Sequence, residues 1–103
     1  MIAFTVMYPN GPDKHFDMDY YLATHIPLVQ EKVGDALKGV TVDKGLSARE
    51  PGSMPEYVTI ARLLFESMED VATRMAPHSP IFDADIPNFT NIKPFILVSE
   101  TMV

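Results

Sequence analysis

Apolar positions along the chain fall into four short runs and two longer stretches with helical spacing. The short runs, at residues 2–8, 39–46, 57–65 and 92–99, are rich in β-branched and aromatic side chains, which is typical of strands. The longer stretches run from residue 17 to about 33 and from residue 67 to about 76, with apolar residues spaced roughly as on one helix face. The predicted order of elements is therefore β-α-β-β-α-β.

Polar residues and prolines locate the first helix. An Asn-Gly pair with two prolines predicts a loop over residues 9–13, and Asp17 can then cap the helix N-terminus. Pro27 stands inside the helix, where it removes one backbone donor and crowds the carbonyl of Ala23. A kink is therefore predicted near residues 25–26.

Prolines also divide the second half of the chain. Ser67 opens the second helix with a capping-box pattern, and prolines at positions 77 and 80 break or kink it around residues 76–79. A short helical turn through Asp85 and a polar loop over residues 86–91 are expected to follow. Pro94 cannot donate to a ladder, so the last strand is predicted at a sheet edge.

These elements match an α+β, ferredoxin-like βαββαβ fold in one domain, residues 1–103, with two helices on one face of a four-stranded antiparallel sheet. Both faces of the predicted strands are largely apolar; in residues 57–65 only Thr59 and Arg62 interrupt the pattern. An uncovered apolar sheet face exceeds what a monomer usually exposes. We therefore expect a homodimer that packs sheet against sheet. The alternative is a monomer with an apolar ligand or an extra element over that face.

The acidic composition narrows the list of partners. With 8 Lys+Arg and 14 Asp+Glu the net charge is −6, and the basic residues are scattered. Nucleic acid and anionic membrane surfaces need clustered cations, so neither is expected as a partner. The chain has no Cys, which excludes disulfides and thiolate metal sites. No export signal or membrane-spanning run is visible, so a cytoplasmic location is expected.

His25 is the first candidate for chemistry. Helical spacing places it on the inward face between Leu22 and Val29, and an imidazole in a partly apolar cleft suits proton transfer near neutral pH. A semi-buried His that only bonds a carbonyl is the alternative. His78 lies between two prolines and either lines a pocket mouth or is solvated. No pair of His has metal-ligand spacing, so no metal is expected.

Phenols and carboxyls supply further candidates. The carboxyls of Asp83 and Asp85 lie two positions apart, so they do not face each other on one helix, and Asp85 could instead orient the loop at residues 86–91. No phosphate-binding, dinucleotide-binding or hydrolase motif is present, and no cofactor is expected. Four phenols could bind a ligand or serve as amphipathic core residues: Tyr8, Tyr20, Tyr21 and Tyr57.

Four segments together resemble the EthD family, named after an ethyl tert-butyl ether degradation protein: YPNGPD at residues 8–13, FDMDYYLATHIPLV at 16–29, APHSP at 76–80 and DIPNFTNIKP at 85–94. The resemblance implies a dimeric α+β barrel, in which the uncovered faces of two sheets pack together. It also implies a ligand cleft between helices and sheet, with His25 as the His of a His-x-Pro-Leu motif and Tyr20 and Tyr21 at the aromatic positions before it. The family has no settled reaction, so the resemblance indicates fold more than function.

Two functional hypotheses remain. The first is an enzyme or auxiliary enzyme of catabolic or secondary metabolism, with cofactor-independent isomerisation, cyclisation or oxidation of an apolar ring or lactone-like molecule. His25 would be its acid/base with Tyr21 and Asp85 in catalytic roles, and the residues expected to contact substrate are Tyr20, Tyr8, His78 and Phe89. The second is a non-catalytic homodimeric binding or accessory protein of a degradation pathway. A heme-handling role is a third, weaker reading.

Overall fold

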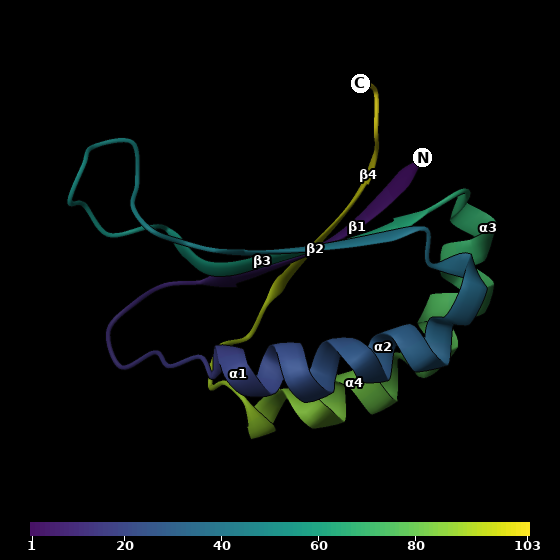
Figure 1. Ribbon diagram of the computed structural model, residues 1–103, viewed down its shortest axis with the longest axis horizontal. Coiled ribbons are helices and arrows are strands. Elements are labelled where there is room, and N and C mark those ends of the chain that lie inside the picture. Colours follow the sequence, from purple (N-terminus) through teal and green to yellow (C-terminus); the bar gives the residue numbers. More distant parts are fainter.

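The computed structural model describes residues 1–103 and contains one antiparallel sheet with its helical segments on one side (Figure 1). The helical segments that follow β1 and β3 lie on the same side of the sheet, below it in Figure 1, so the other face of the sheet is free of helices. The elements are β1 (Ile2–Pro9), α1 (Met18–Tyr20), α2 (Ile26–Val33), β2 (Gly39–Lys44), β3 (Tyr57–Phe65), α3 (Met68–Asp70), α4 (Ser79–Asp85) and β4 (Phe95–Glu100). This is the predicted α+β, ferredoxin-like architecture.

The strand order in the sheet is β2-β3-β1-β4, and every neighbouring pair is antiparallel. Strand β4 lies at an edge, as the proline argument predicted. It begins at Phe95, directly after Pro94, rather than at the predicted Ile92, because Ile92 packs into the core before the chain joins the sheet. Strand β2 also ends earlier than predicted, at Lys44, and a Cβ at the next residue, Gly45, would collide with the Tyr57 carbonyl.

The first helix runs without a break from residue 18 to residue 33, but its middle is a π-helical turn. Asp17 caps it as predicted, since its side chain accepts a hydrogen bond from the Tyr20 backbone N–H at 3.0 Å. The backbone N–H of Ile26 donates to the carbonyl of Tyr21, five residues back, directly before the donor-less Pro27. The irregularity predicted at residues 25–26 thus takes the form of a widened turn over Tyr21–His25.

The second helix has the same construction. Ser67 caps it by accepting a hydrogen bond from the Asp70 backbone N–H at 3.1 Å, and a π-helical turn over Val71–Met75 follows. The predicted break at Pro77 is a 3₁₀ turn over Ala76–His78. Beyond it the chain forms the seven-residue helix α4, longer than the single turn expected, because Pro80 sits in its first turn, where a missing N–H is tolerated.

The segment at residues 86–91 was expected to be a polar loop, and the structure corrects this. Its Phe89 and Thr90 are buried, and a 3₁₀ turn over Ile86–Asn88 precedes them. The Phe89 carbonyl accepts a hydrogen bond from the backbone N–H of Asp17 at 2.8 Å, and Thr90 forms a β-bridge with Phe16. The segment therefore joins the start of the first helix to the end of the second.

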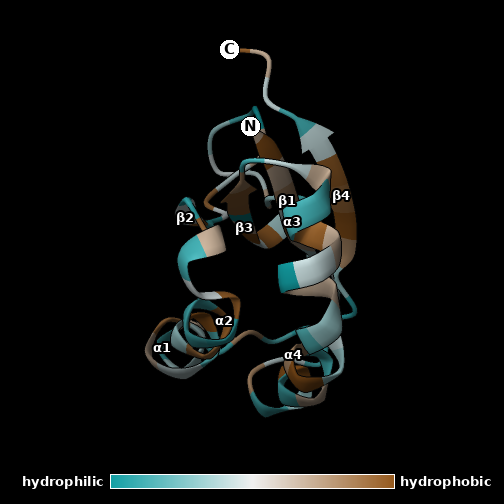
Figure 2. Ribbon diagram, turned by 90° about the vertical axis from the view of Figure 1, so that its right-hand side faces the viewer, coloured by the Kyte–Doolittle hydropathy of each residue, from teal (hydrophilic) through white to brown (hydrophobic).

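The helix-covered face of the sheet forms the core. On β3 every second residue, from Thr59 to Phe65, is buried beneath the helices. The opposite face is more mixed than predicted, because the register places Arg62 between Thr5 and Thr41 across three strands. Strand β4, brown at the sheet edge in Figure 2, extends beyond the helices. Its four apolar residues 95–98 are 38–59% exposed. No helix has the length and apolarity that a membrane crossing requires.

Candidate functional site

A cavity of about 200 Å³ lies between the helices and the covered face of the sheet. Most of its walls are apolar side chains from β1, β3 and the two helices. The polar groups among its lining residues are His25, the phenols of Tyr8 and Tyr21, the hydroxyl of Ser79 and the carboxyl of Asp83. An apolar cavity with a few polar groups is the usual form of a small-molecule site.

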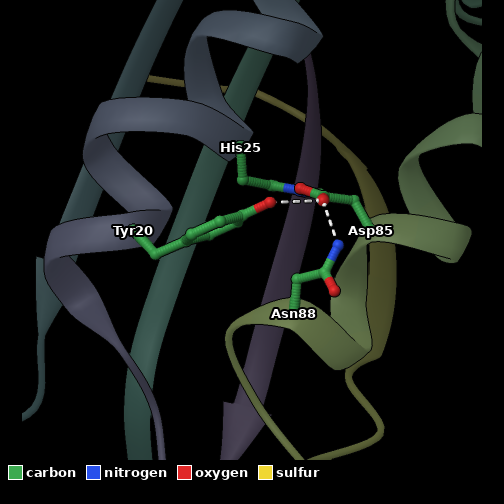
Figure 3. A network of polar contacts seen from close by, with 4 residues as sticks. All are labelled: Tyr20, His25, Asp85 and Asn88. Carbon is green, nitrogen blue, oxygen red and sulfur yellow. Dashed lines mark hydrogen bonds and ion pairs between the residues drawn. The ribbon is translucent and has the colours of Figure 1, made fainter.

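His25 is held from one side by Asp85. Its Nδ1 atom lies 2.9 Å from Oδ2 of Asp85, and the imidazole is 6% exposed. The second carboxylate oxygen, Oδ1, accepts hydrogen bonds from the Tyr20 hydroxyl at 2.7 Å and from Nδ2 of Asn88 at 2.9 Å. Figure 3 shows the four side chains converging on the Asp85 carboxyl. Three donors from two helical segments thus fix one carboxyl group.

The π-helical turn explains why Tyr20 and His25 can share one carboxyl. In an ordinary α-helix, residues five positions apart diverge by about 140° around the axis. The wider turn over Tyr21–His25 brings the two side chains to the same side of the helix. Asp85 comes from the last position of α4, and Asn88, three residues further on, comes from the 3₁₀ turn after it.

Aromatic rings fix the plane of the imidazole. The Tyr21 ring stacks on His25 with centroids 5.3 Å apart and planes inclined by 15°. The Phe89 ring contacts it at 4.6 Å, inclined by 56°, and Phe82 lies at 6.5 Å, nearly perpendicular. These rings and the Asp85 contact leave the imidazole little rotational freedom, which is what a preorganised acid/base requires.

The hydrogen bonds keep the Asp85 carboxyl ionised. Burial alone would raise its pKa, but the hydrogen bonds from Asn88, Tyr20 and His25 outweigh that effect and lower the pKa below the usual 3.8. Because an ionised carboxylate only accepts hydrogen bonds, Nδ1 of His25 carries the proton in this contact. In the neutral imidazole the lone pair is then on Nε2, which makes no hydrogen bond within the protein.

Two phenols lie in the same cavity wall. Tyr8 and Tyr21 are 1% and 2% exposed, and their ring centroids are 5.8 Å apart. Burial raises the pKa of Tyr21 to about 12, and burial together with the charge and hydrogen bonding of Tyr21 raises the pKa of Tyr8 further. Both groups therefore keep their protons at neutral pH and act as hydrogen-bond donors.

The structure brings most of the predicted site residues together, but only some of them line the cavity. Tyr8, Tyr21 and His25 line the cavity. Tyr20 does not, because its hydroxyl is bound to Asp85, which in turn contacts His25 from outside the cavity wall. The phenol bond also raises the pKa of Tyr20.

Two predicted substrate contacts lie behind or beside the cavity. Phe89 is 1% exposed and packs on His25 and the tyrosines rather than lining the cavity. His78 is half-buried, 6.2 Å from the Phe82 ring, and does not line the cavity either. No group of three His, Asp or Glu side chains gathers in a way that could hold a metal ion.

Sequence reasoning missed Asn88 and Ser79, and it considered Asp83 only as a partner of Asp85, not as part of the site. For Asn88 a signal existed, since it follows Asp85 by three positions, the spacing at which helical side chains meet. Because residues 86–91 were expected to form a polar loop, the helical spacing of Asp85 and Asn88 was overlooked. Ser79 and Asp83 enter the cavity wall because the chain after Pro77 forms the full helix α4, which the prolines concealed.

The fold of this chain is similar to that of several solved structures. An EthD-like protein from Ralstonia eutropha JMP134 is 34% identical, superposes with a TM-score of 0.93, and the match covers 99% of this chain and 92% of that one. An ethyl tert-butyl ether degradation family protein from Bacillus halodurans C-125 is 16% identical with a TM-score of 0.74, over 99% of both chains. A protein from Bacteroides fragilis NCTC 9343, described as dimeric with a ferredoxin-like fold, is 11% identical with a TM-score of 0.56, covering 97% of this chain and 95% of that one.

No family model matches the sequence, and no curated protein matches it either. The two lower-identity structures show the fold alone. The 34% identity with the Ralstonia protein, over nearly the whole of both chains, agrees with the motifs at residues 16–29 and 85–94. The chain belongs to the EthD family.

Proposed function

We propose that the protein is a small-molecule enzyme that moves protons with His25, without a cofactor, in isomerisation, cyclisation or oxidation of an apolar ring or lactone-like substrate. The observation that carries the proposal is the 2.9 Å contact from Asp85 to Nδ1 of a buried His25 that lines an apolar cavity. This contact leaves the basic Nε2 atom for a bound molecule.

The proposal gives each neighbour a distinct role. Asp85 orients the imidazole and stabilises the imidazolium that forms when Nε2 takes a proton. Tyr20 holds Asp85 through its hydroxyl and acts as a positioning residue. Tyr21 stacks on the imidazole and, with Tyr8, offers a phenol to the substrate. Phe89 supports the ring of His25 from behind.

We also propose that the protein is a homodimer. On β4, Phe95 and Leu97 are 59% and 51% exposed, and the register places them with Met7 and Thr5 on the helix-free face of the sheet. Large apolar side chains exposed on a sheet face are a usual mark of an interface. The structurally similar Bacteroides protein is described as dimeric. A second copy packed against the helix-free face by a two-fold contact would bury Phe95 and Leu97.

A probe for a general base in an apolar cavity tests the function directly. In 5-nitrobenzisoxazole a base removes the C–H proton, the N–O bond breaks, and 2-cyano-4-nitrophenolate forms, which is followed by its absorbance. We expect the protein to accelerate this elimination and His25→Ala to lower kcat/KM by about 100-fold or more. His15→Ala is the matched control, because His15 is exposed and does not line the cavity.

The same experiment also tests the second hypothesis, that the protein is a non-catalytic binding or accessory protein. If the probe binds but His25→Ala leaves the rate unchanged, His25 is not the base and the non-catalytic reading is favoured. If neither binding nor acceleration occurs, the cavity is not a site for apolar rings, and both hypotheses fail.

A further inference from the structure

The charge of the cavity restricts the substrate that the proposed function can use. No Lys or Arg lines the cavity, whereas the carboxyl of Asp83 does and that of Asp85 lies just behind His25. Arg62, Arg74 and Lys93 each adjoin a lining residue in the sequence but do not line the cavity themselves, and Lys93 lines a separate surface groove. A carboxylate or phosphate bound here would be desolvated beside acidic groups without a cation to compensate. The cavity therefore disfavours an anionic occupant.

The volume of the cavity limits the size of the occupant. An apolar cavity of about 150 Å³ in another protein is known to hold benzene. The present cavity, at about 200 Å³, has room for a six-membered ring with a short substituent or a small second ring. It is too small for a fused system of three or more rings unless the walls move.

The polar groups of the cavity can interact with one small molecule in two ways. One group can donate a hydrogen bond to an acceptor of that molecule, and another can remove an acidic hydrogen from it. His25 offers a lone pair on Nε2, and the Tyr8–Tyr21 pair, in which one hydroxyl bonds the other, offers an O–H donor from the same wall. A molecule that satisfies both the lone pair and the donor needs a hydrogen-bond acceptor close to a removable proton. A carbonyl group with a hydrogen on the adjacent carbon has this combination.

We propose, on the basis of the function above, that the cavity takes an uncharged one-ring or two-ring carbonyl compound whose oxygen accepts a hydrogen bond from the Tyr8–Tyr21 pair. Nε2 of His25 removes the proton from the adjacent carbon. The C–H electron pair becomes the C=C bond of an enolate, and the carbonyl pair moves to oxygen, where a phenol stabilises it. Return of the proton to the same or a conjugated carbon completes an exchange or an isomerisation, so no oxidant or reductant is needed.

Three ligands of matched size separate the parts of this proposal. Acetophenone has the ring, the carbonyl and removable hydrogens. Benzoate has the same number of heavy atoms but carries a negative charge, and ethylbenzene lacks the carbonyl. Binding is followed by nuclear magnetic resonance of the cavity residues, and exchange of the acetophenone methyl hydrogens is followed in D₂O. We expect acetophenone to bind at least about tenfold more tightly than benzoate and its methyl group to exchange in a His25-dependent way.

Removing the phenols one at a time tests the acceptor contact. Tyr8→Phe and Tyr21→Phe keep the buried rings, so the fold is preserved, which circular dichroism checks. We expect at least one of them to weaken acetophenone binding about fivefold to tenfold and to leave ethylbenzene within twofold. Equal loss for both ligands would overturn the phenol contact.

The remaining outcomes also decide the proposal. Benzoate binding as tightly as acetophenone would overturn the claim of an uncharged substrate. Absence of binding by acetophenone would overturn the substrate class. In either case, His25-dependent elimination of the benzisoxazole probe would leave the proposed function standing, whereas its loss would remove both.

Discussion

The Oδ2 atom of Asp85 lies 2.9 Å from Nδ1 of His25, although the two residues are 60 positions apart in the sequence. His25 comes from a π-helical turn before Pro27, and Asp85 comes from the last position of α4 after Pro77 and Pro80. Each partner therefore belongs to a helical segment whose regular hydrogen bonding is changed by a proline. The contact fixes the tautomer of the imidazole, and the proposed chemistry depends on that tautomer.

Asp85→Asn should lower the rate of benzisoxazole elimination by about 10-fold to 100-fold without unfolding the protein. The amide can donate to Nδ1, which would place the ring proton on Nε2 and remove the base from the cavity. Initial rates of the variant and the wild type at one pH provide the measurement. Asp19→Asn, an exposed carboxyl of α1, serves as the control. An unchanged rate in Asp85→Asn would contradict the orienting role.

Tyr20→Phe and Asn88→Ala should each have a smaller effect, about threefold to tenfold on kcat/KM. Each variant removes one donor to Oδ1 of Asp85 while the other remains. Loss of a donor also raises the pKa of Asp85, so the ¹³C resonance of this carboxyl should titrate at a higher pH in each variant than in the wild type. A rate loss without such a movement would indicate a merely structural role for these residues.

The stability of the fold should depend on Asp85 at low pH. Its pKa is lowered from 3.8 in the folded protein, so the folded state binds its proton less tightly than the unfolded chain does. The stabilisation is therefore complete above the unfolded pKa, at about pH 5 and higher, and is lost as pH falls through the lowered folded pKa. Urea unfolding at pH 7, 4 and 3 should show a steeper loss for the wild type than for Asp85→Asn. Parallel curves would contradict the prediction.

Thr59→Val should stabilise the protein by about 1 kcal/mol. The Thr59 hydroxyl is buried opposite Tyr8 in the sheet register and has no hydrogen-bond partner, which is unfavourable. Valine has nearly the same shape and keeps the β-branched side chain that suits a strand. Urea unfolding at pH 7 measures the difference. A destabilised variant would mean that the hydroxyl has a partner after all.

Leu97→Glu should convert the proposed dimer into monomers. Leu97 is 51% exposed on β4, opposite Thr5 in the register, where a second sheet would bury it. A buried, unpaired carboxylate is strongly unfavourable. Leu22→Glu is a matched control, because Leu22 is 50% exposed on the first helix, away from the sheet. Light scattering after size-exclusion chromatography gives the mass, and a dimeric Leu97→Glu would place the interface elsewhere.

The fold could be predicted from the sequence, because its elements depend on residues that are close together along the chain. Examples are the apolar pattern of β3 from Tyr57 to Phe65 and the helix caps at Asp17 and Ser67. The site was only partly predictable. Periodicity placed His25 on the inward face, but it could not show that a π-helical turn aligns Tyr20 with it. The burial of Phe89 and the position of Asn88 depend on contacts with the first helix, far away along the chain.

Long-range ¹H–¹⁵N correlation spectroscopy of the histidine rings shows most directly whether His25 presents a basic Nε2 atom to the cavity. Spectra are recorded over a range of pH, without and with acetophenone. In the neutral imidazole we expect the proton on Nδ1, and we expect the Nε2 resonance to move when acetophenone binds. A proton on Nε2, or an Nε2 resonance that no cavity ligand affects, would contradict the proposed role of His25.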